Sequence, residues 1–317
     1  MSRVMLRTRS GSLLVITLWV VTILSVLAIA IARYLSVEVR LTKYRLAREQ
    51  AKALAHSGVY LVMQRLAHDA NPQNVPQPYE AYDWLGDDWA LPREDLHVAG
   101  GRITVRSVVD EERLLNLNAA TKEQLESLTG SSLAATAILA YHDASTSGET
   151  PVDEPPYFQK NTPIKAMEEL ADIPDIHDTD LAKLQQLTSV STDAVTSPTV
   201  NINTVEGDVL VALDWPKALV DPLIASRPGP DGVWGTADDC KITDATTADP
   251  APTLEGCTQI PAATWNPLLT MLDVVASSSI FRIQVEATAG SPPVRQRIDA
   301  IVKRAPDGGQ ILAWREQ

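Results

Sequence analysis

The chain has 317 residues and a net charge of −13, enough length for one large or two ordinary domains beyond a membrane anchor. Residues 1–52 carry a net charge of +7, so that residues 53–317 carry −20. Such an acidic body repels phosphate backbones, which argues against nucleic acid as a partner. It suits divalent cations or basic protein partners, although an acidic surface also serves solubility alone.

The first expected element is an uncharged apolar run at residues 13–32, LLVITLWVVTILSVLAIAIA. A helix of this length spans roughly 30 Å, the thickness of the hydrocarbon layer of a membrane. A cleaved secretory signal has a shorter apolar core and a small-residue cleavage site. This run instead continues without a breaker to about residue 68, before Asn71-Pro72. We therefore expect one long helix whose residues 12–32 cross a membrane.

Beyond the membrane the helix is expected to be amphipathic. Apolar Val39, Leu46, Ala53 and Tyr60 recur at steps of seven, with Arg, Lys and Glu at other positions. We expect this stripe to pair with neighbouring helices. Residues 71–98 follow as a proline- and aromatic-rich segment, which predicts an irregular loop packed on the long helix.

Three alternating apolar patterns predict a sheet. The first strand is expected at residues 101–109, and the patterns at 280–287 and 294–302 predict an antiparallel hairpin. We expect this hairpin to pair with the first strand and to cover the C-terminal half of the long helix.

A short pattern occurs twice between these strands. Asn116-Leu117-Asn118-Ala119 and Asn201-Ile202-Asn203-Thr204 each precede an amphipathic helical pattern. In each copy the last Asn, or the Ala-Thr or Thr after it, is placed to cap the following helix. Pro163 is placed to start another helix, which Ile173-Pro174 ends. Residues 113–271 are thus expected to form a mainly helical inserted domain.

One interpretation of this duplication is a helix-hairpin-helix module that binds DNA through backbone amides. The hairpin would be Leu128-Thr129-Gly130-Ser131-Ser132, which lacks the second glycine of that module, and its surroundings are acidic. A membrane-tethered DNA-binding protein is therefore kept as an alternative only.

The candidate metal site is GPDGVWGTADDC, residues 229–240. Asp231, Asp238 and Asp239 lie among glycines that let the loop fold its oxygens onto one point, and oxygen ligands suit Ca²⁺. The loop resembles the D-G-x-x-G-T-x-D-D calcium loops of extracytoplasmic bacterial proteins. It is not an EF-hand, because no Glu follows at the twelfth position. The alternative is an Asp-rich turn without an ion.

The two cysteines, Cys240 and Cys257, lie in the turn-rich segment 228–260. If the body lies outside the cytoplasm, a disulfide closing this loop is expected, and otherwise two free thiols. No catalytic motif of the G-x-S-x-G, H-E-x-x-H or P-loop type is present, so we expect no enzyme.

The N-terminus resembles that of type IV pilins and pseudopilins, because a short basic leader ending in Gly11 precedes the apolar run and the unbroken helix. The resemblance implies that prepilin peptidase cleaves between Gly11 and Ser12 and that the new N-terminus is methylated. Ser12 departs from the usual Phe or Met. The resemblance also implies a single-pass inner-membrane anchor with a periplasmic body, whereas the charges flanking the run mildly favour the opposite orientation.

The fifth residue after the implied cleavage is Ile16, where most pilin-like proteins have a glutamate that pairs with the N-terminal amine of a neighbour. A carboxylate in lipid is costly unless it is paired. A subunit without it needs no partner above it, as at a filament tip. The chain resembles the K-type minor pseudopilin of type II secretion systems in three features. These are the missing glutamate, the two Asn motifs and the segment PIKAMEEL at residues 163–170. Calcium sites are also known in that family.

The K-type resemblance implies an α+β fold, with a pilin-like long N-terminal helix packed on an antiparallel sheet and a large inserted, mainly helical domain (SAM-like or helix-hairpin-helix-like). The expected division is leader 1–11, transmembrane helix 12–32, periplasmic helix 33–70, sheet region 71–112 and 272–305, and insert 113–271. The implied role is non-enzymatic. The chain would join I- and J-type minor pseudopilins in a tip complex that initiates or caps the periplasmic pseudopilus during export of folded proteins across the outer membrane. A minor type IV pilin, which usually keeps the glutamate and lacks the insert, is the alternative.

Overall fold

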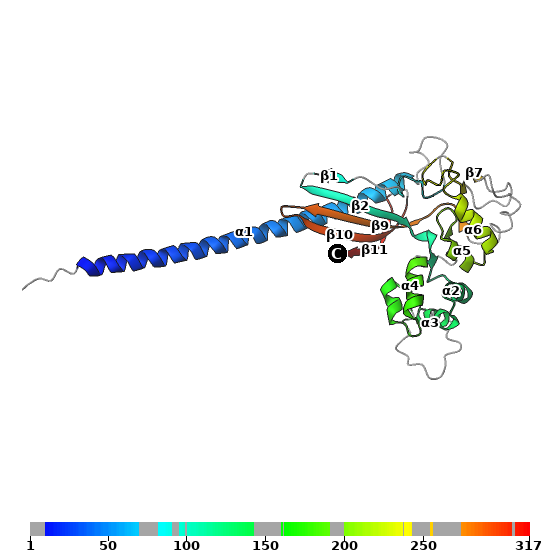
Figure 1. The fold of residues 1–317 in the computed structure, drawn as a ribbon, viewed down its shortest axis with the longest axis horizontal. Helices are drawn as coiled ribbons and strands as arrows, with labels where there is room; N and C mark the ends of the chain where they lie inside the picture. Colours follow the sequence, from blue (N-terminus) through cyan, green and yellow to red (C-terminus); the bar gives the residue numbers. More distant parts are fainter. Residues whose placement is uncertain are drawn as a thin grey trace, which may run out of the picture.

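The computed structural model describes most of the chain in three consecutive parts. Figure 1 shows a helix that projects alone, a sheet packed along the second half of that helix, and a group of short helices at the opposite end. The described residues are 10–69, 82–90, 95–98, 100–142, 160, 162–190, 200–236, 238–242, 254–255, 274–305 and 308–317.

The projecting element is helix α1, Ser10–Asp69, an unbroken helix of 60 residues as predicted. Its N-terminal half is long and apolar enough to cross a membrane, with a mean hydropathy of 2.8 in its most apolar window. The predicted heptad stripe is exposed along its length, with Leu46 at 59% and Tyr60 at 52% exposure. A neighbouring side of α1 packs against the sheet instead. Its buried residues are Ala47, Ala51, Ala55, Val59, Val62, Met63, Leu66 and Ala67.

The sheet has five antiparallel strands in the order β1-β2-β9-β10-β11. Their bounds are Leu96–Val98, Gly101–Asp110, Ile280–Ala289, Val294–Lys303 and Gln310–Glu316. The predicted hairpin is β9–β10, and β9 pairs with β2 as expected. Strands β1 and β11 were not predicted, so the sheet extends beyond the expected region of 272–305. In β11 the run ILAW is apolar throughout and does not alternate between apolar and polar residues, so the sequence pattern does not indicate a strand there.

Gly58 allows close packing between α1 and the sheet. A Cβ atom at this position would lie 2.7 Å from Val285 Cγ1 and 2.8 Å from Ile103 Cγ2. These distances are shorter than van der Waals contact, so only glycine fits without a shift. The apolar side chains of β2, β9 and β10 that face α1 are buried with it in one core.

The insert consists of two units, each built between a first and a last short strand that pair in parallel. The first unit contains β3 Leu115–Asn116, α2 Lys122–Thr129, α3 Ser132–His142, the 3-10 helix η4 Met167–Asp172, α4 Asp178–Leu187 and β4 Thr188–Ser189. The second contains β5 Val200–Asn201, α5 Gly207–Ala212, α6 Lys217–Ser226, β6 Lys241–Ile242, β7 Leu254–Glu255 and β8 Val274–Val275. The 3-10 turn η1 Glu111–Arg113 connects β2 to the insert.

The two Asn motifs make the same hydrogen bonds. Asn118 Nδ2 donates to Ile164 O at 2.9 Å, and Ile164 N donates to Asn118 Oδ1 at 2.8 Å. Asn203 Nδ2 donates to Ile242 O at 2.9 Å, and Ile242 N donates to Asn203 Oδ1 at 2.8 Å. The predicted duplication in sequence is therefore a duplication in structure.

Two details of the helix prediction need correction. Pro163 does not start a helix, because both backbone polar groups of its neighbour Ile164 are bound by Asn118; the 3-10 helix begins only at Met167. Helix α2 is capped by Thr121 and Gln124 in a capping box, as expected, but Glu206, the N-cap residue of α5, makes no side-chain cap hydrogen bond.

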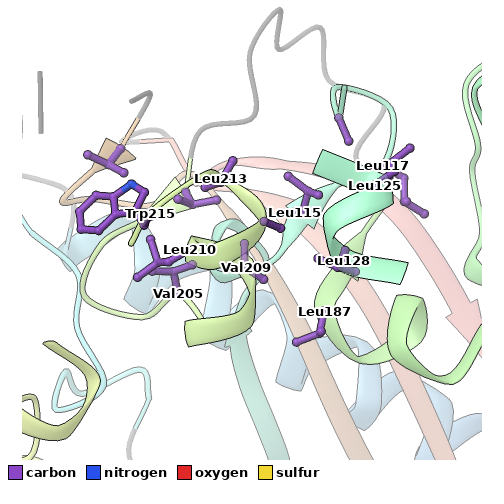
Figure 2. Close-up of a cluster of buried hydrophobic side chains, with 14 of the residues drawn as sticks. Leu115, Leu117, Leu125, Leu128, Leu187, Val205, Val209, Leu210, Leu213 and Trp215 are labelled. Carbon is purple, nitrogen blue, oxygen red and sulfur yellow. The ribbon is translucent and has the colours of Figure 1, made fainter. Parts of the chain in front are cut away.

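The two units share one apolar core, in which leucines of the first unit face the α5 residues of the second (Figure 2). The labelled members are Leu115, Leu117, Leu125, Leu128 and Leu187 from the first unit, and Val205, Val209, Leu210, Leu213 and Trp215 from the second. The aromatic loop before β1 joins both cores. Trp84 packs in the insert, whereas Trp89 packs in the sheet core, with its ring 5.1 Å from that of Phe281.

Candidate functional site

The residues of the implied cleavage site lie at the start of α1. Gly11 and Ser12 fall in its first turn, directly before the exposed apolar run. Ile16 is 58% exposed, as expected of a side chain that faces lipid or a neighbouring helix. Cleavage and methylation stay predictions.

The three predicted metal ligands come together in the loop between α6 and β6. One carboxylate oxygen each from Asp231, Asp238 and Asp239 lie within 4.8 Å of one another. Asp239 is fully buried, Asp238 is half-buried and Asp231 is exposed. Three carboxylates around one point offer the hard oxygen ligands that Ca²⁺ takes. The donor set therefore fits this ion.

Glycines and a threonine shape the loop. Gly229 has φ of 64°. A Cβ there would lie 2.6 Å from the carbonyl oxygen of Asp238, so glycine is required. The hydroxyl of Thr236 lies 2.7 Å from Asp238 Oδ1 and 3.1 Å from Asp239 Oδ1. Hydrogen bonding by Thr236 lowers the pKa of Asp238, which keeps this carboxylate charged. Thr236 is the threonine of the D-G-x-x-G-T-x-D-D pattern, although it was not among the predicted ligands.

We call the segment between α6 and β6, which contains the three predicted ligands, the metal loop. Residues at both of its ends are bound to the second Asn motif. Arg227 donates from its two terminal nitrogens to Val205 O at 2.6 Å and to Ile202 O at 2.7 Å. At the other end, Asn203 holds Ile242. Arg227 is buried, and burial lowers its pKa to about 10, so it is still a cation at neutral pH. Nothing in the sequence distinguished this arginine from a surface residue.

A buried polar cluster connects the same motif to the sheet. Asp110, at the end of β2, accepts hydrogen bonds at its Oδ2 from Ser278 Oγ at 2.6 Å, Thr204 Oγ1 at 2.5 Å and Asn201 Nδ2 at 3.1 Å. Burial raises the pKa of Asp110 to about 6. Thr204 thus binds the sheet instead of capping α5.

Arg304, directly after β10, completes this junction between sheet and insert. It binds Asp83 through two nitrogens at 2.8 and 2.6 Å and Asp69 through one at 3.0 Å. Asp69, Asp83 and Asp87 form a second group of close carboxylates. Because Arg304 already forms ion pairs with two of them, Asp69 and Asp83, we interpret this group as an ion-paired joint. Burial raises the pKa of Asp87 to about 8.

The predicted disulfide falls partly outside the described residues. Cys240 is buried at the end of the metal loop, but Cys257 is not among the residues that the structure describes. The pairing of Cys240 with Cys257 therefore stays a prediction.

Comparison with known proteins bears on the fold. No family model and no curated protein sequence matches the chain. Among solved structures, the chain is similar to a chain of the crystal structure of the GspK-GspI-GspJ complex from the type 2 secretion system of enterotoxigenic Escherichia coli. The TM-score is 0.56 at 19% identity, and the match covers 88% of this chain and 99% of that chain. The predicted pilin-like α+β fold is confirmed: a long N-terminal helix on an antiparallel sheet, with additional helices.

Proposed function

We propose that this protein is a non-enzymatic minor pseudopilin of K type in a type II secretion system. The observation that carries the proposal is the fold similarity, which covers 88% of this chain and 99% of the similar chain. A minor type IV pilin would share the helix and sheet, so the insert, with its two Asn-bound units, favours the K type.

The proposed partners are I- and J-type minor pseudopilins. The similar structure is a complex of three such proteins. In the present chain, the exposed stripe of Leu46, Ala53 and Tyr60 lies on a side of α1 that the sheet leaves open. Apolar residues at steps of seven on a helix that is free on this side suit packing against other helices.

The proposed position is the tip of the pseudopilus. The insert lies at the end of the body opposite to the apolar segment (Figure 1), where its width would block addition of a further subunit. Ile16 supports the same position, because without a carboxylate it pairs with no N-terminal amine above it.

Proposed processing by prepilin peptidase has its own test. Intact-mass measurement of the full chain, purified from cells with the peptidase, should give a protein that starts at methylated Ser12. Cells without the peptidase provide the control, in which the chain keeps Met1. A chain that keeps its leader in both strains would remove the pilin-type assignment.

We further propose that Asp231, Asp238 and Asp239 bind a structural Ca²⁺ ion. By coordinating the three close carboxylates, the ion would offset their mutual repulsion. It would thereby hold the loop in one conformation. Calcium should raise the melting temperature of the full chain in detergent, and Asp231→Asn should abolish the increase. Asp221→Asn, an exposed residue of α6, is the matched control and should keep it. An unchanged melting temperature at millimolar calcium would contradict this proposal.

Co-purification tests the proposed assembly. The full chain, co-expressed with I- and J-type pseudopilins, should elute with both as one complex. Leu46→Glu should prevent this, because a charge enters the helix contact, whereas Arg45→Glu on the adjacent side of α1 should not. Failure of the wild-type chain to bind either partner would contradict the proposal.

A further inference from the structure

One face of the sheet packs on α1, and the other carries polar side chains. The strand register places Arg102 opposite Thr288, Thr104 opposite Glu286, and Arg297 opposite Glu286, so that all of these share the second face. Near the β9–β10 turn, no described helix or strand covers this face. We call its exposed cationic part, Arg102, Arg106, Arg295 and Arg297, the arginine face.

The arginine face holds more guanidinium groups than nearby carboxylates can neutralise. Arg106 and Arg295 both bind a single oxygen of Glu286, at 3.0 and 3.2 Å. The side chain of Glu286 is 10% exposed, whereas those of Arg106 and Arg295 are 50% and 68% exposed. One largely buried carboxylate therefore positions two exposed cations.

The other two arginines are held in different ways. Arg297 donates to the neutral Gln284 Oε1 at 2.9 Å, and Gln284 in turn donates to Asp299. Arg102 is paired with Asp95 at 3.1 Å. Side chains that are already held lose little conformational freedom when a ligand binds, which favours binding.

We propose that the arginine face binds the carboxylates of an acidic surface on a protein partner. Every cation of this face is an arginine, whose planar fork binds carboxylates through two parallel hydrogen bonds. The body around the face carries a net charge of −20 over residues 53–317. An acidic partner is thus attracted here and repelled elsewhere, which fixes its orientation.

The same observations favour a protein over nucleic acid or lipid. A long phosphate backbone would extend beyond this face onto the acidic body, where it is repelled. The strands run along α1 (Figure 1). The arginine face is therefore parallel to the axis of α1, and it does not point toward a membrane that α1 crosses. This inference concerns the arginine face alone and does not depend on the proposed function.

Binding of a fluorescein-labelled decaglutamate peptide to the full chain in neutral detergent tests the proposal by fluorescence anisotropy. Arg295→Gln with Arg297→Gln should weaken binding about tenfold, since two charge-assisted contacts are lost while Arg106 still pairs with Glu286. Lys183→Gln with Lys217→Gln on the insert is the matched control, with the same loss of charge, and should change affinity less than about twofold. Equal binding by the wild type and the arginine variant would overturn the proposal.

Two further measurements separate a carboxylate partner from other anions. Arg295→Lys with Arg297→Lys keeps the charge but removes the fork, and should bind the peptide several-fold more weakly than the wild type; unchanged binding would overturn the role of arginine geometry. Duplex DNA and glycerophosphoglycerol, the soluble headgroup of phosphatidylglycerol, should bind less tightly than the peptide. Tighter binding of either, lost in the Arg295→Gln/Arg297→Gln variant, would overturn the assignment to a protein partner.

Discussion

Asn203 binds both backbone polar groups of Ile242, across 39 residues of sequence. The pair joins the second Asn motif to the end of the metal loop, and Asn201 of the same motif binds Asp110 at the end of β2. The loop, the motif and the sheet are therefore linked by buried hydrogen bonds. Asn118 and Ile164 repeat the first of these links in the other unit.

Replacing Asn203 by alanine should destabilise the insert by about 3 kcal/mol, because two buried backbone groups of Ile242 lose their partners. Asn118→Ala should have a similar effect, since its bonds are the same. Chemical unfolding of the full chain in detergent, followed by tryptophan fluorescence, measures both. A loss below about 1 kcal/mol in either variant would contradict the proposed equivalence of the motifs.

Burial raises the pKa of Glu112 to about 7 from 4.5. The folded chain thus holds this proton more tightly than the unfolded chain. The contribution of Glu112 to stability is complete below pH 4.5 and is lost as the pH rises to 7, by about 3 kcal/mol. The Glu112 carboxylate accepts hydrogen bonds from Ser279 N at 2.9 Å and from Ser279 Oγ at 2.6 Å. Glu112→Gln keeps an acceptor for Ser279 but cannot ionise, so the unfolding free energy of this variant should lack the decline. Glu126→Gln, an exposed change on α2, should keep the wild-type pH profile.

Gly58→Ala should destabilise the chain by up to about 2 kcal/mol. The gain in helix propensity is about 1 kcal/mol, but overpacking against Val285 and Ile103 costs about 1–3 kcal/mol. Thermal unfolding should show a lower melting temperature. Ser57→Ala, an exposed neighbour on the same helix, should leave it unchanged or slightly raised. A more stable Gly58→Ala variant would show that α1 and the sheet are not closely packed here.

Arg304→Met should cost about 3–5 kcal/mol, because Asp83 is left buried without its ion pair. Combining it with Asp83→Asn should recover much of this loss, since the uncompensated charge is then removed. Comparing the two single variants and the double variant by chemical unfolding gives the coupling energy. No recovery in the double variant would show that the joint does not depend on this pair.

Local patterns predicted much of this fold. The apolar run predicted α1, and alternation predicted β2, β9 and β10, because each side of these elements meets a different environment. The repeated Asn residues predicted two similar units. The contacts of the second Asn in each unit were not predictable, since Ile164 and Ile242 lie 46 and 39 residues away and carry no signal.

The candidate site likewise has parts that the sequence predicts and parts that it does not. The Asp-rich loop stands out because its glycines and carboxylates lie close together in sequence. The junction formed by Asp83, Asp110 and Arg304 does not, because its residues come from distant segments. The arginine face likewise needed strand register, which placed Arg102 and Arg295 on one side of the sheet.

The proposed position of this subunit at the tip of a pseudopilus can be tested by locating the insert on isolated filaments. Gold-labelled antibodies against residues 113–271, viewed by electron microscopy, should bind at one end of each filament. Labels distributed along the filaments would contradict the claim, because the insert would then fit between stacked subunits.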